Sequence, residues 1–291
     1  MSLNDWKQKG SHFDFEGNSI FCKTESSDKE ALLCLHGFPT SSYDYHKIWD
    51  SLAERFSLVA FDMIGYGFSD KPADFDYTTF RQADVLQAFI RETGIGKFHI
   101  LSHDYGNTII QELLARDEEG KLDFEIASVC MMNGALFPET HRPILAQKIL
   151  ISPIGFLFNR LVTEKRMKTS LASVFGKETQ PTDRELGEFL EIFRSNGGDK
   201  IAYKLIQYMR ERERYRERWV GGLERLKKPF RMINGLEDRV SGAHLVTRFR
   251  EIMPHEDIIE LPNIGHFPHF EAPEVTLKHF FDFHDKIRQA A

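Results

Sequence analysis

Asp104 and the short residues around it are the first candidates for chemistry. Asp104 lies in the run "SHDYG" (residues 102–106), between an apolar, β-prone stretch and a stretch with apolar residues at helical spacing. A sharp strand-to-helix turn that presents a nucleophile needs small residues two positions before and after it, and Ser102 and Gly106 meet this need. Ser102 itself is flanked by Ile100 and Asp104, which are too bulky or too charged for that turn. The pattern therefore places Asp104 at the centre, although an Asp here would also suit a helix N-cap.

Two further residues follow later strands and complete a possible catalytic set. Asp238 comes after the apolar run "RMING", with Glu237 as the alternative, and His266 lies in the turn "LPNIGHFPHF", with His269 as the alternative. A carboxylate is already ionised at neutral pH and can attack a saturated carbon directly, which gives a covalent ester. A histidine would then activate water against the ester, and a second carboxylate would orient the imidazole. The order nucleophile, acid, histidine strengthens the assignment.

The stretch "HGFP" (residues 36–39) follows the apolar run "ALLCL". A backbone N–H from such a loop, together with the N–H of the residue after the nucleophile, forms an oxyanion hole. These donors would be Phe38 and Tyr105. The alternative is an ordinary turn rich in Gly and Pro.

The elements that must position these residues alternate between strands and helices. A hairpin over residues 12–24 comes first, around Glu16-Gly17-Asn18. The later strands are short and nearly all apolar, which predicts a mostly parallel sheet with helices on both faces. We expect strands at residues 31–37, 57–62, 98–104, 126–133, 229–235 and 257–262, and helices at residues 44–56, 79–93, from 105, 243–253 and 275–289.

The alternation breaks between residues 137 and 220, where only helical signals occur. A helical block inserted between two strands is most simply a cap over the carboxyl edge of the sheet, where open α/β sheets place their ligands. The sequence thus predicts a core of residues 1–136 and 221–291 and a cap of residues 137–220.

The composition excludes several classes of protein. The chain has 291 residues, 41% hydrophobic and 28% charged, and a formal net charge of -6, which argues against a general nucleic-acid binder. The run "RERERYRERW" (residues 210–219) alternates its charges, as in a solvated helix with ion pairs. Three widely spaced cysteines suggest no disulfide framework and no metal motif. The sequence shows no signal peptide and no apolar run as long as a membrane span, so we expect a cytoplasmic protein.

Longer stretches carry a resemblance to known families. The chain resembles α/β-hydrolases of the Asp-nucleophile branch, which holds epoxide hydrolases and haloalkane dehalogenases, and it is most similar to the mesoderm-specific transcript protein family. The resemblance implies a hydrolase that needs neither metal nor cofactor, acts on a small hydrophobic substrate with water, and is of epoxide hydrolase type. A dehalogenase and a non-catalytic ligand receptor or interaction protein are the alternatives. The matching stretches are "LHGFPTSSYDYHKIW", "GYGFSDKP", "LSHDYGNTIIQELL", "NGALFPETHRPILAQKIL" and "RERWVGGL".

The same resemblance suggests residues that contact the substrate or the leaving group. Dehalogenases usually place Trp after the nucleophile, whereas this chain has Tyr105, which disfavours that reaction. Epoxide hydrolases use cap tyrosines to protonate the opening ring. Tyr208 matches the second tyrosine of that pair, with Tyr203 and Tyr215 as alternatives, and His141 is a substitute for the first.

Three further features complete the predicted site. His36, at the start of "HGFP", is placed with the groups near the substrate or leaving group. Asn133 ends its strand and either orients the catalytic set or caps the strand. The apolar segment of residues 148–162 either lines a tunnel for a hydrophobic substrate or packs between cap and core.

Overall fold

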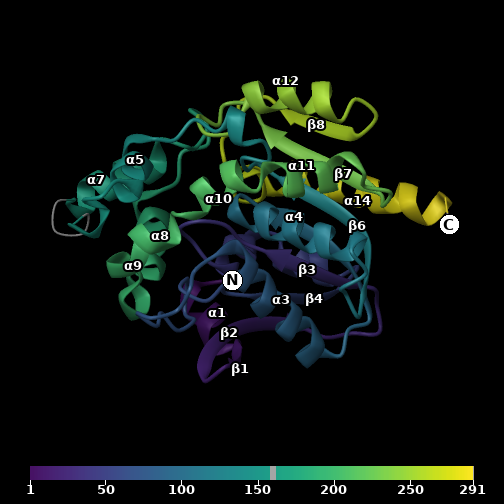
Figure 1. Ribbon diagram of the computed structural model, residues 1–291, viewed down its shortest axis with the longest axis horizontal. Helices are drawn as coiled ribbons and strands as arrows, with labels where there is room; N and C mark the ends of the chain where they lie inside the picture. Colours follow the sequence, from purple (N-terminus) through teal and green to yellow (C-terminus); the bar gives the residue numbers. More distant parts are fainter. Residues whose placement is uncertain (158–161, 291) are drawn as a thin grey trace.

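The computed structural model describes residues 1–157 and 162–290, and an eight-stranded sheet forms its centre (Figure 1). The spatial order is β1-β2-β4-β3-β5-β6-β7-β8. The pairs β1–β2 and β2–β4 are antiparallel, and all later pairs are parallel. The strands are β1 (Ser11–Phe15), β2 (Asn18–Glu25), β3 (Ala31–Leu35), β4 (Ser57–Phe61), β5 (Lys97–His103), β6 (Glu125–Met132), β7 (Phe230–Gly235) and β8 (Asp257–Leu261).

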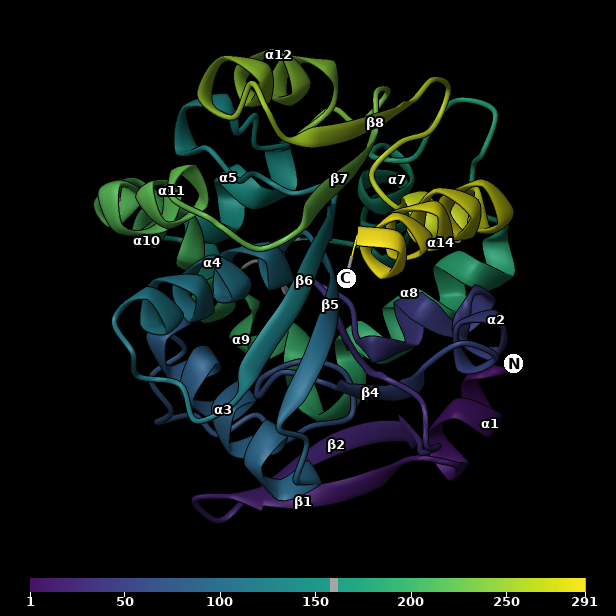
Figure 2. The same ribbon diagram turned by 90° about the vertical axis from the view of Figure 1, so that its right-hand side faces the viewer.

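Helices cover both faces of the sheet, as Figure 2 shows. On one face lie α1 (Leu3–Gln8), α2 (Trp49–Ala53) and α14 (Pro273–Ala290), and on the other lie α3 (Thr79–Thr93), α4 (Tyr105–Glu118), α11 (Arg216–Glu224) and α12 (Ala243–Ile252). Each layer has its own apolar core, with Trp49 and Phe280 in the first and Ile110 and Phe249 in the second. This double cover explains why strands such as β3 are buried at every residue. The predicted fold class is confirmed.

A further group of helices lies between β6 and β7, in the segment predicted to form the cap. The helices α5, α7, α8 and α9 gather on one side of the molecule in Figure 1, whereas α10 lies next to α11. The expected boundary at residue 220 falls inside α11, which packs along α4. The elements are η2 (Pro138–Thr140), α5 (Leu145–Ile151), η3 (Gly155–Leu157), α7 (Glu164–Ala172), α8 (Asp183–Arg194), η4 (Ser195–Gly197), α9 (Gly198–Leu205) and α10 (Tyr208–Arg214).

Three details differ from the sequence prediction. The helix expected at residues 44–56 is a 3-10 turn, η1 (Ser42–Lys47), followed by the short α2. Buried polar groups explain this, because Asp44 accepts a hydrogen bond from Thr40, and the Tyr45 hydroxyl donates to backbone carbonyls of the sheet. Helix α1 was not expected, since it has only six residues; a capping box from Ser2 starts it. No helix among the described residues is long and apolar enough to cross a membrane.

The third difference concerns the charged run of residues 210–219. It divides into the end of α10 and the start of α11, with a break at Tyr215. Arg216 and Arg218 do form ion pairs with glutamates, as expected. Arg212, however, is only 2% exposed, so the interpretation of this run as solvated was wrong at that position. Residues 158–161 of the predicted tunnel segment lie outside the described residues.

Candidate active site

Asp104 occupies the tight turn between β5 and α4. Its backbone has φ 46° and ψ -111°, a strained conformation for a residue with a side chain. The turn closes because Gly106 lies against β3, where an added Cβ would come within 2.7 Å of the Leu35 carbonyl oxygen. Ser102 is buried and donates a hydrogen bond to Asn107 at 2.7 Å, so its hydroxyl is engaged inside the elbow. The strain and the close packing hold the Asp104 carboxylate at the carboxyl edge of the sheet.

The two carboxylate oxygens of Asp104 have different neighbours. Oδ2 accepts a hydrogen bond from the backbone N–H of Phe38 at 3.3 Å and lies 3.9 Å from Nε2 of His266. Oδ1 lies 3.8 Å from Nη2 of Arg212, on α10. The side chain is almost fully buried. One oxygen thus faces the "HGFP" loop and the histidine, and the other faces the cap.

His266 stands between the two carboxylates. Its Nδ1 lies 2.7 Å from Oδ2 of Asp238, a charge-assisted hydrogen bond, and its Nε2 faces Asp104. Asp238 is fixed by four further donors, the backbone N–H groups of Val240 and Ser241, the hydroxyl of Ser241 and the side-chain amide of Asn133. This network sets the imidazole with one nitrogen toward the acid and the other toward the elbow.

The two alternatives for these roles lie elsewhere. Glu237 points away from the triad and accepts a hydrogen bond from the backbone N–H of Lys177 at 2.7 Å. His269 is fully buried beneath the turn that carries His266 and has no contact with Asp104 at hydrogen-bond distance. The geometry therefore brings together Asp104, His266 and Asp238 from three separate loops.

Asn133 links two of these loops. Its side chain accepts the backbone N–H of Gly235 at 2.6 Å and donates to the Gly235 carbonyl oxygen and to Asp238, while its own carbonyl accepts the N–H of Asp104 at 2.7 Å. One residue at the end of β6 thus connects the elbow to the end of β7. Both interpretations of Asn133 agree with these contacts, because the residue follows the end of β6 and its side chain donates a hydrogen bond to Asp238.

The charges of the triad shift one another. Burial alone would lower the pKa of His266, but the carboxylates of Asp238 and Asp104 raise it to about 10. Burial alone would raise the pKa of Asp104, but His266 and Arg212 hold it below its usual range. The pKa of Asp238 is lowered in the same way, because His266 outweighs the effect of burial. Esterification of Asp104 would remove one of the two negative charges that raise the His266 pKa, so the imidazole would lose its proton more readily in that state.

The oxyanion hole predicted from the sequence would consist of two backbone N–H groups. That of Phe38 contacts Asp104 directly, and that of Tyr105 starts α4 and makes no hydrogen bond within the described part of the chain. The Tyr105 side chain turns away from this position. Its ring stacks on Tyr208 at 4.2 Å, and its hydroxyl lies 3.3 Å from the Thr79 hydroxyl oxygen.

Among the predicted substrate-contacting residues, His36, Asn133 and Tyr208 are buried and His141 is half-buried, and they differ in their bonding. His36 has both ring nitrogens in backbone contacts, with Gly37 and Met63 at 2.9 and 3.0 Å, so it holds the "HGFP" loop in place. The Tyr208 hydroxyl and His141 Nε2 have no hydrogen-bond partner among the described residues. Burial raises the pKa of Tyr208 well above its usual range and lowers that of His141 to about 4, so both groups are neutral at pH 7.

Arg212 is the residue that the sequence analysis missed. Its Nε donates to Thr108 at 2.7 Å, its Nη2 donates to the backbone oxygen of Asp104 at 3.3 Å, and its Nη1 has no partner among the described residues. Its guanidinium lies 4.7 Å from the centre of the Tyr208 ring. The one available signal was the spacing of four between Tyr208 and Arg212, which places both on one helix face.

A small apolar cavity opens over Asp104 and His266. Its volume is about 100 Å³, and its polar lining residues outside the triad are Thr40, Gln147 and Ser170. Tyr208, His141 and Arg212 lie outside this lining. The apolar lining comes from Phe38 and Pro39, from cap residues Ile144, Ala146, Leu150, Met167, Leu171, Val174, Phe189, Leu190 and Phe193, and from Val240 and Phe267.

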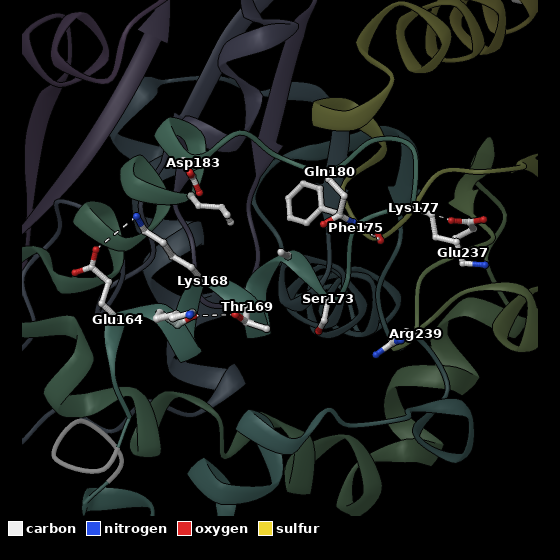
Figure 3. Close-up of a pocket in the computed structure, with 13 residues that line it drawn as sticks. Glu164, Lys168, Thr169, Ser173, Phe175, Lys177, Gln180, Asp183, Glu237 and Arg239 are labelled. Carbon is white, nitrogen blue, oxygen red and sulfur yellow. Dashed lines mark hydrogen bonds and ion pairs between the residues drawn. The ribbon is translucent and has the colours of Figure 1, made fainter.

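A wider cleft of about 860 Å³ lies on the other face of α7. Figure 3 shows Glu164 and Lys168 on one side of it, and Lys177, Glu237 and Arg239 on the other. None of the triad residues lines this cleft. The helix α7 therefore separates an open, charged depression from the apolar cavity over Asp104.

Comparison with known proteins places the chain in a family. Residues 30–273 match the family model described as alpha/beta hydrolase fold. The chain is 36% identical to the mesoderm-specific transcript protein of Mus musculus over 97% of its own length and 88% of that protein, and 37% identical to the Homo sapiens homologue with the same coverage. The chain therefore belongs to the α/β-hydrolase fold family and, within it, to the family of mesoderm-specific transcript proteins.

Solved structures support the fold. A haloalkane dehalogenase, the DbeA-M1 loop variant from Bradyrhizobium elkanii, superposes with a TM-score of 0.79 at 22% identity, over 97% of both chains. At this identity the likeness concerns the fold alone. The resemblance predicted from the sequence stretches is confirmed, and the class is that of a hydrolase.

Proposed function

We propose that this protein is a hydrolase that uses Asp104 as a nucleophile and passes through a covalent ester, most simply with a small apolar epoxide. One observation carries the proposal: His266 lies between Asp238, at 2.7 Å, and Asp104, at 3.9 Å, directly beneath an apolar cavity. The chemistry requires these three side chains and water, and no cofactor.

In the first step, Oδ1 of Asp104 attacks an epoxide carbon, and the carbon–oxygen bond of the ring breaks. Oδ1 is the attacking oxygen because Oδ2 already faces the Phe38 N–H, where it becomes the carbonyl oxygen of the ester. The ring oxygen then takes a proton. Tyr208 is the proposed donor, since its buried hydroxyl is unpartnered among the described residues. The Tyr208 hydroxyl reaches the substrate when the cavity extends past Phe38. The ring centres of Phe38 and Tyr208 lie 6.0 Å apart.

In the second step, His266 takes a proton from water, and the water oxygen adds to the ester carbonyl. The negative charge that develops on that oxygen is stabilised by the N–H groups of Phe38 and Tyr105. Collapse of the intermediate breaks the ester bond, and the leaving oxygen takes the remaining proton of the added water, so Asp104 returns as a carboxylate and a diol is released. The proton held by His266 then replaces the one that Tyr208 donated in the first step. Asp238 stabilises the imidazolium during this step.

Haloalkane dehalogenation is the alternative reaction for the same triad. The Gln147 side chain favours it, because it lines the cavity and offers an amide N–H to a halide. The orientation of Tyr105 weighs against it, because the ring stacks on Tyr208 instead of facing the cavity. A non-catalytic receptor ranks below both reactions, since a receptor has no need of the Asp238–His266 hydrogen bond.

Intact-protein mass spectrometry of the His266→Gln variant tests the proposal. The variant is incubated with a panel of small epoxides and haloalkanes, and the double variant Asp104→Ala/His266→Gln serves as the matched control. We expect an adduct with the whole mass of the epoxide, which peptide mapping places on Asp104 and which the control lacks. An alkyl adduct without halogen would instead establish the dehalogenase. If no panel member left an adduct, the proposal of an ester-forming hydrolase would be overturned for these substrate classes.

The Tyr208→Phe variant separates the two reactions. Removal of the hydroxyl should slow adduct formation with epoxides, because the opening ring loses its proton donor, and should leave reaction with haloalkanes unchanged. Equal rates with epoxides before and after the substitution would show that Tyr208 only packs against the core.

A further inference from the structure

A second group of ionisable side chains lies behind the catalytic histidine. Asp44 comes from η1, His103 ends β5 directly before the nucleophile, and His269 belongs to α13 (Pro268–Glu271). All three are completely buried. One ligand atom from each residue lies within 4.8 Å of the other two. The fold thus gathers a carboxylate and two imidazoles in its interior.

Each residue of this group has at least one polar atom without a partner among the described residues. Oδ1 of Asp44, Nδ1 of His103 and both ring nitrogens of His269 make no hydrogen bond to any described residue. A buried polar atom without a partner costs about 1–3 kcal/mol, and such atoms are rare in native proteins. Four of them in one place indicate that something binds there.

Two of these residues, His103 and Asp44, are held on their other side in the way that metal ligands are held. The Nε2–H of His103 donates to the backbone oxygen of His266 at 2.8 Å, which leaves a lone pair on Nδ1. Oδ2 of Asp44 accepts a hydrogen bond from Thr40, which leaves Oδ1 available. The His269 ring stacks on Tyr45 with centroids 4.9 Å apart. In metal sites the second nitrogen of a ligating histidine usually donates to a carbonyl or carboxylate, and ligating carboxylates are themselves hydrogen-bonded.

We propose that Asp44, His103 and His269 bind a divalent transition-metal ion, with Zn²⁺ as the first candidate. Two imidazoles and one carboxylate form a common donor set for such ions, whereas Mg²⁺ and Ca²⁺ prefer oxygen ligands. A water molecule completes the coordination. The ligand atoms lie up to 4.8 Å apart and must move closer together when the ion binds, since Zn–N and Zn–O distances are about 2.0–2.2 Å.

The ion would join three segments that carry the active site. Asp44 follows the "HGFP" loop, His103 precedes Asp104, and His269 follows His266 in the same turn. Through the His103 hydrogen bond to the His266 backbone, the ion would also fix the turn that carries the catalytic imidazole. It does not contact the reacting atoms, so the role is one of positioning. The sequence predicts no metal site, because these three residues lie far apart in the chain and form no motif with metal-ligand spacing.

The test compares zinc content and thermal stability in the full chain. The protein is produced in zinc-supplemented medium, and is also refolded with and without ZnCl₂, because the site is buried. The variants His269→Phe and Asp44→Asn each remove one ligand. His284→Phe is the matched control, since His284 is also buried, packs against Phe56 and Phe280, and has an unpartnered Nε2 within the described structure.

We expect one zinc ion per chain by elemental analysis in the unmutated protein and in His284→Phe, and less than a tenth of that in both ligand variants. Zinc should raise the melting temperature by about 5 °C or more in the first two proteins and leave the ligand variants unchanged. Co²⁺ in place of zinc should give visible absorption bands that the ligand variants lack. Absence of bound metal after both loading routes, or equal metal in all variants, would overturn the proposal. The zinc content, the melting temperature and the Co²⁺ absorption do not depend on the hydrolase reaction.

Discussion

The molecule contains two buried groups made of the same kinds of side chain. One is the triad of Asp104, His266 and Asp238, and the other is the group of Asp44, His103 and His269. A hydrogen bond from His103 to the His266 backbone links the two groups. In the triad, Asp238 has four donors and His266 lies between two carboxylates. In the other group, four atoms have no partner within the described residues.

The difference separates two uses of the same chemistry. Groups that must react in a fixed geometry are held by protein hydrogen bonds on every side but the reactive one. Groups that bind a ligand lie close together and keep polar atoms that have no hydrogen-bond partner within the described residues. If this distinction is right, substitutions in the triad should harm activity or stability directly, whereas substitutions in the other group should matter only when the metal is present.

The largest effect is expected for Asp104→Ala. Without the carboxylate no ester forms, so kcat on any substrate identified by the adduct screen should fall by at least about 10⁴-fold. Steady-state kinetics measures the loss, and circular dichroism checks the fold. Ser102→Ala is the control, because it removes the only hydroxyl nucleophile within the elbow motif. If Ser102→Ala lost as much activity as Asp104→Ala, the assignment of the nucleophile would be wrong.

The Asp238→Asn variant should show the next largest effect. An amide cannot stabilise the imidazolium or fix its tautomer, so kcat should fall by about 10³–10⁴-fold. The ester on Asp104 should accumulate, as rapid quench and mass spectrometry would detect. Glu237→Gln alters the neighbouring carboxylate, which faces the outer cleft, and should keep nearly full activity. Similar losses in both variants would remove the distinction between Asp238 and its neighbour.

Asn133→Ala tests the hydrogen bonds that hold the triad. The substitution removes the acceptor of the Gly235 N–H and one donor to Asp238. The free energy of unfolding should therefore fall by about 2–4 kcal/mol. Urea denaturation measures the change. The control Gln180→Ala removes an exposed side chain whose amide donates to the Gly176 carbonyl, and should cost about 1 kcal/mol or less. A loss below that of the control would show that the triad does not depend on Asn133.

The smallest effect is expected for His269→Phe in the metal-free protein. Phenylalanine keeps an aromatic ring against Tyr45 and removes two unpartnered nitrogens, so the free energy of unfolding should change by no more than about 1 kcal/mol in either direction. Urea denaturation in the presence of a chelator gives the value. A loss of several kcal/mol would mean that these nitrogens already have partners, such as buried water, and would weaken the comparison between the two groups.

The sequence predicted the fold and the residues that the structure brings together as the triad, because both follow from local patterns. Apolar runs and helical spacing indicate the sheet and its helices, and the catalytic candidates each follow a strand. The choice between Glu237 and Asp238, or between His266 and His269, has a different basis. It depends on which imidazole turns toward Asp104 and which carboxylate turns toward that imidazole. These orientations are a property of the folded loops.

The residues that escaped prediction are those whose partners lie far away in the chain. Arg212 belongs to a run of alternating charges, and only its contacts with Thr108 and Asp104 distinguish it from the solvated arginines beside it. Asp44 and His103 have ordinary neighbours in sequence and meet only through the sheet. The 3-10 turn at residues 42–47 escaped for the same reason, since the buried bonds of Asp44 and Tyr45 prevail over helical spacing.

The contacts of Arg212 also bear on how this architecture can be recombined. An insertion between two strands is often treated as an exchangeable module, because its ends lie close together and the sheet closes without it. Here the inserted helix α10 supplies a donor to the carbonyl of the nucleophile itself and to the first turn of the following helix. A graft that carried in a foreign insertion would remove both of these donated hydrogen bonds. In this lineage, insertion and elbow are therefore expected to be inherited, and to be engineered, as a single unit.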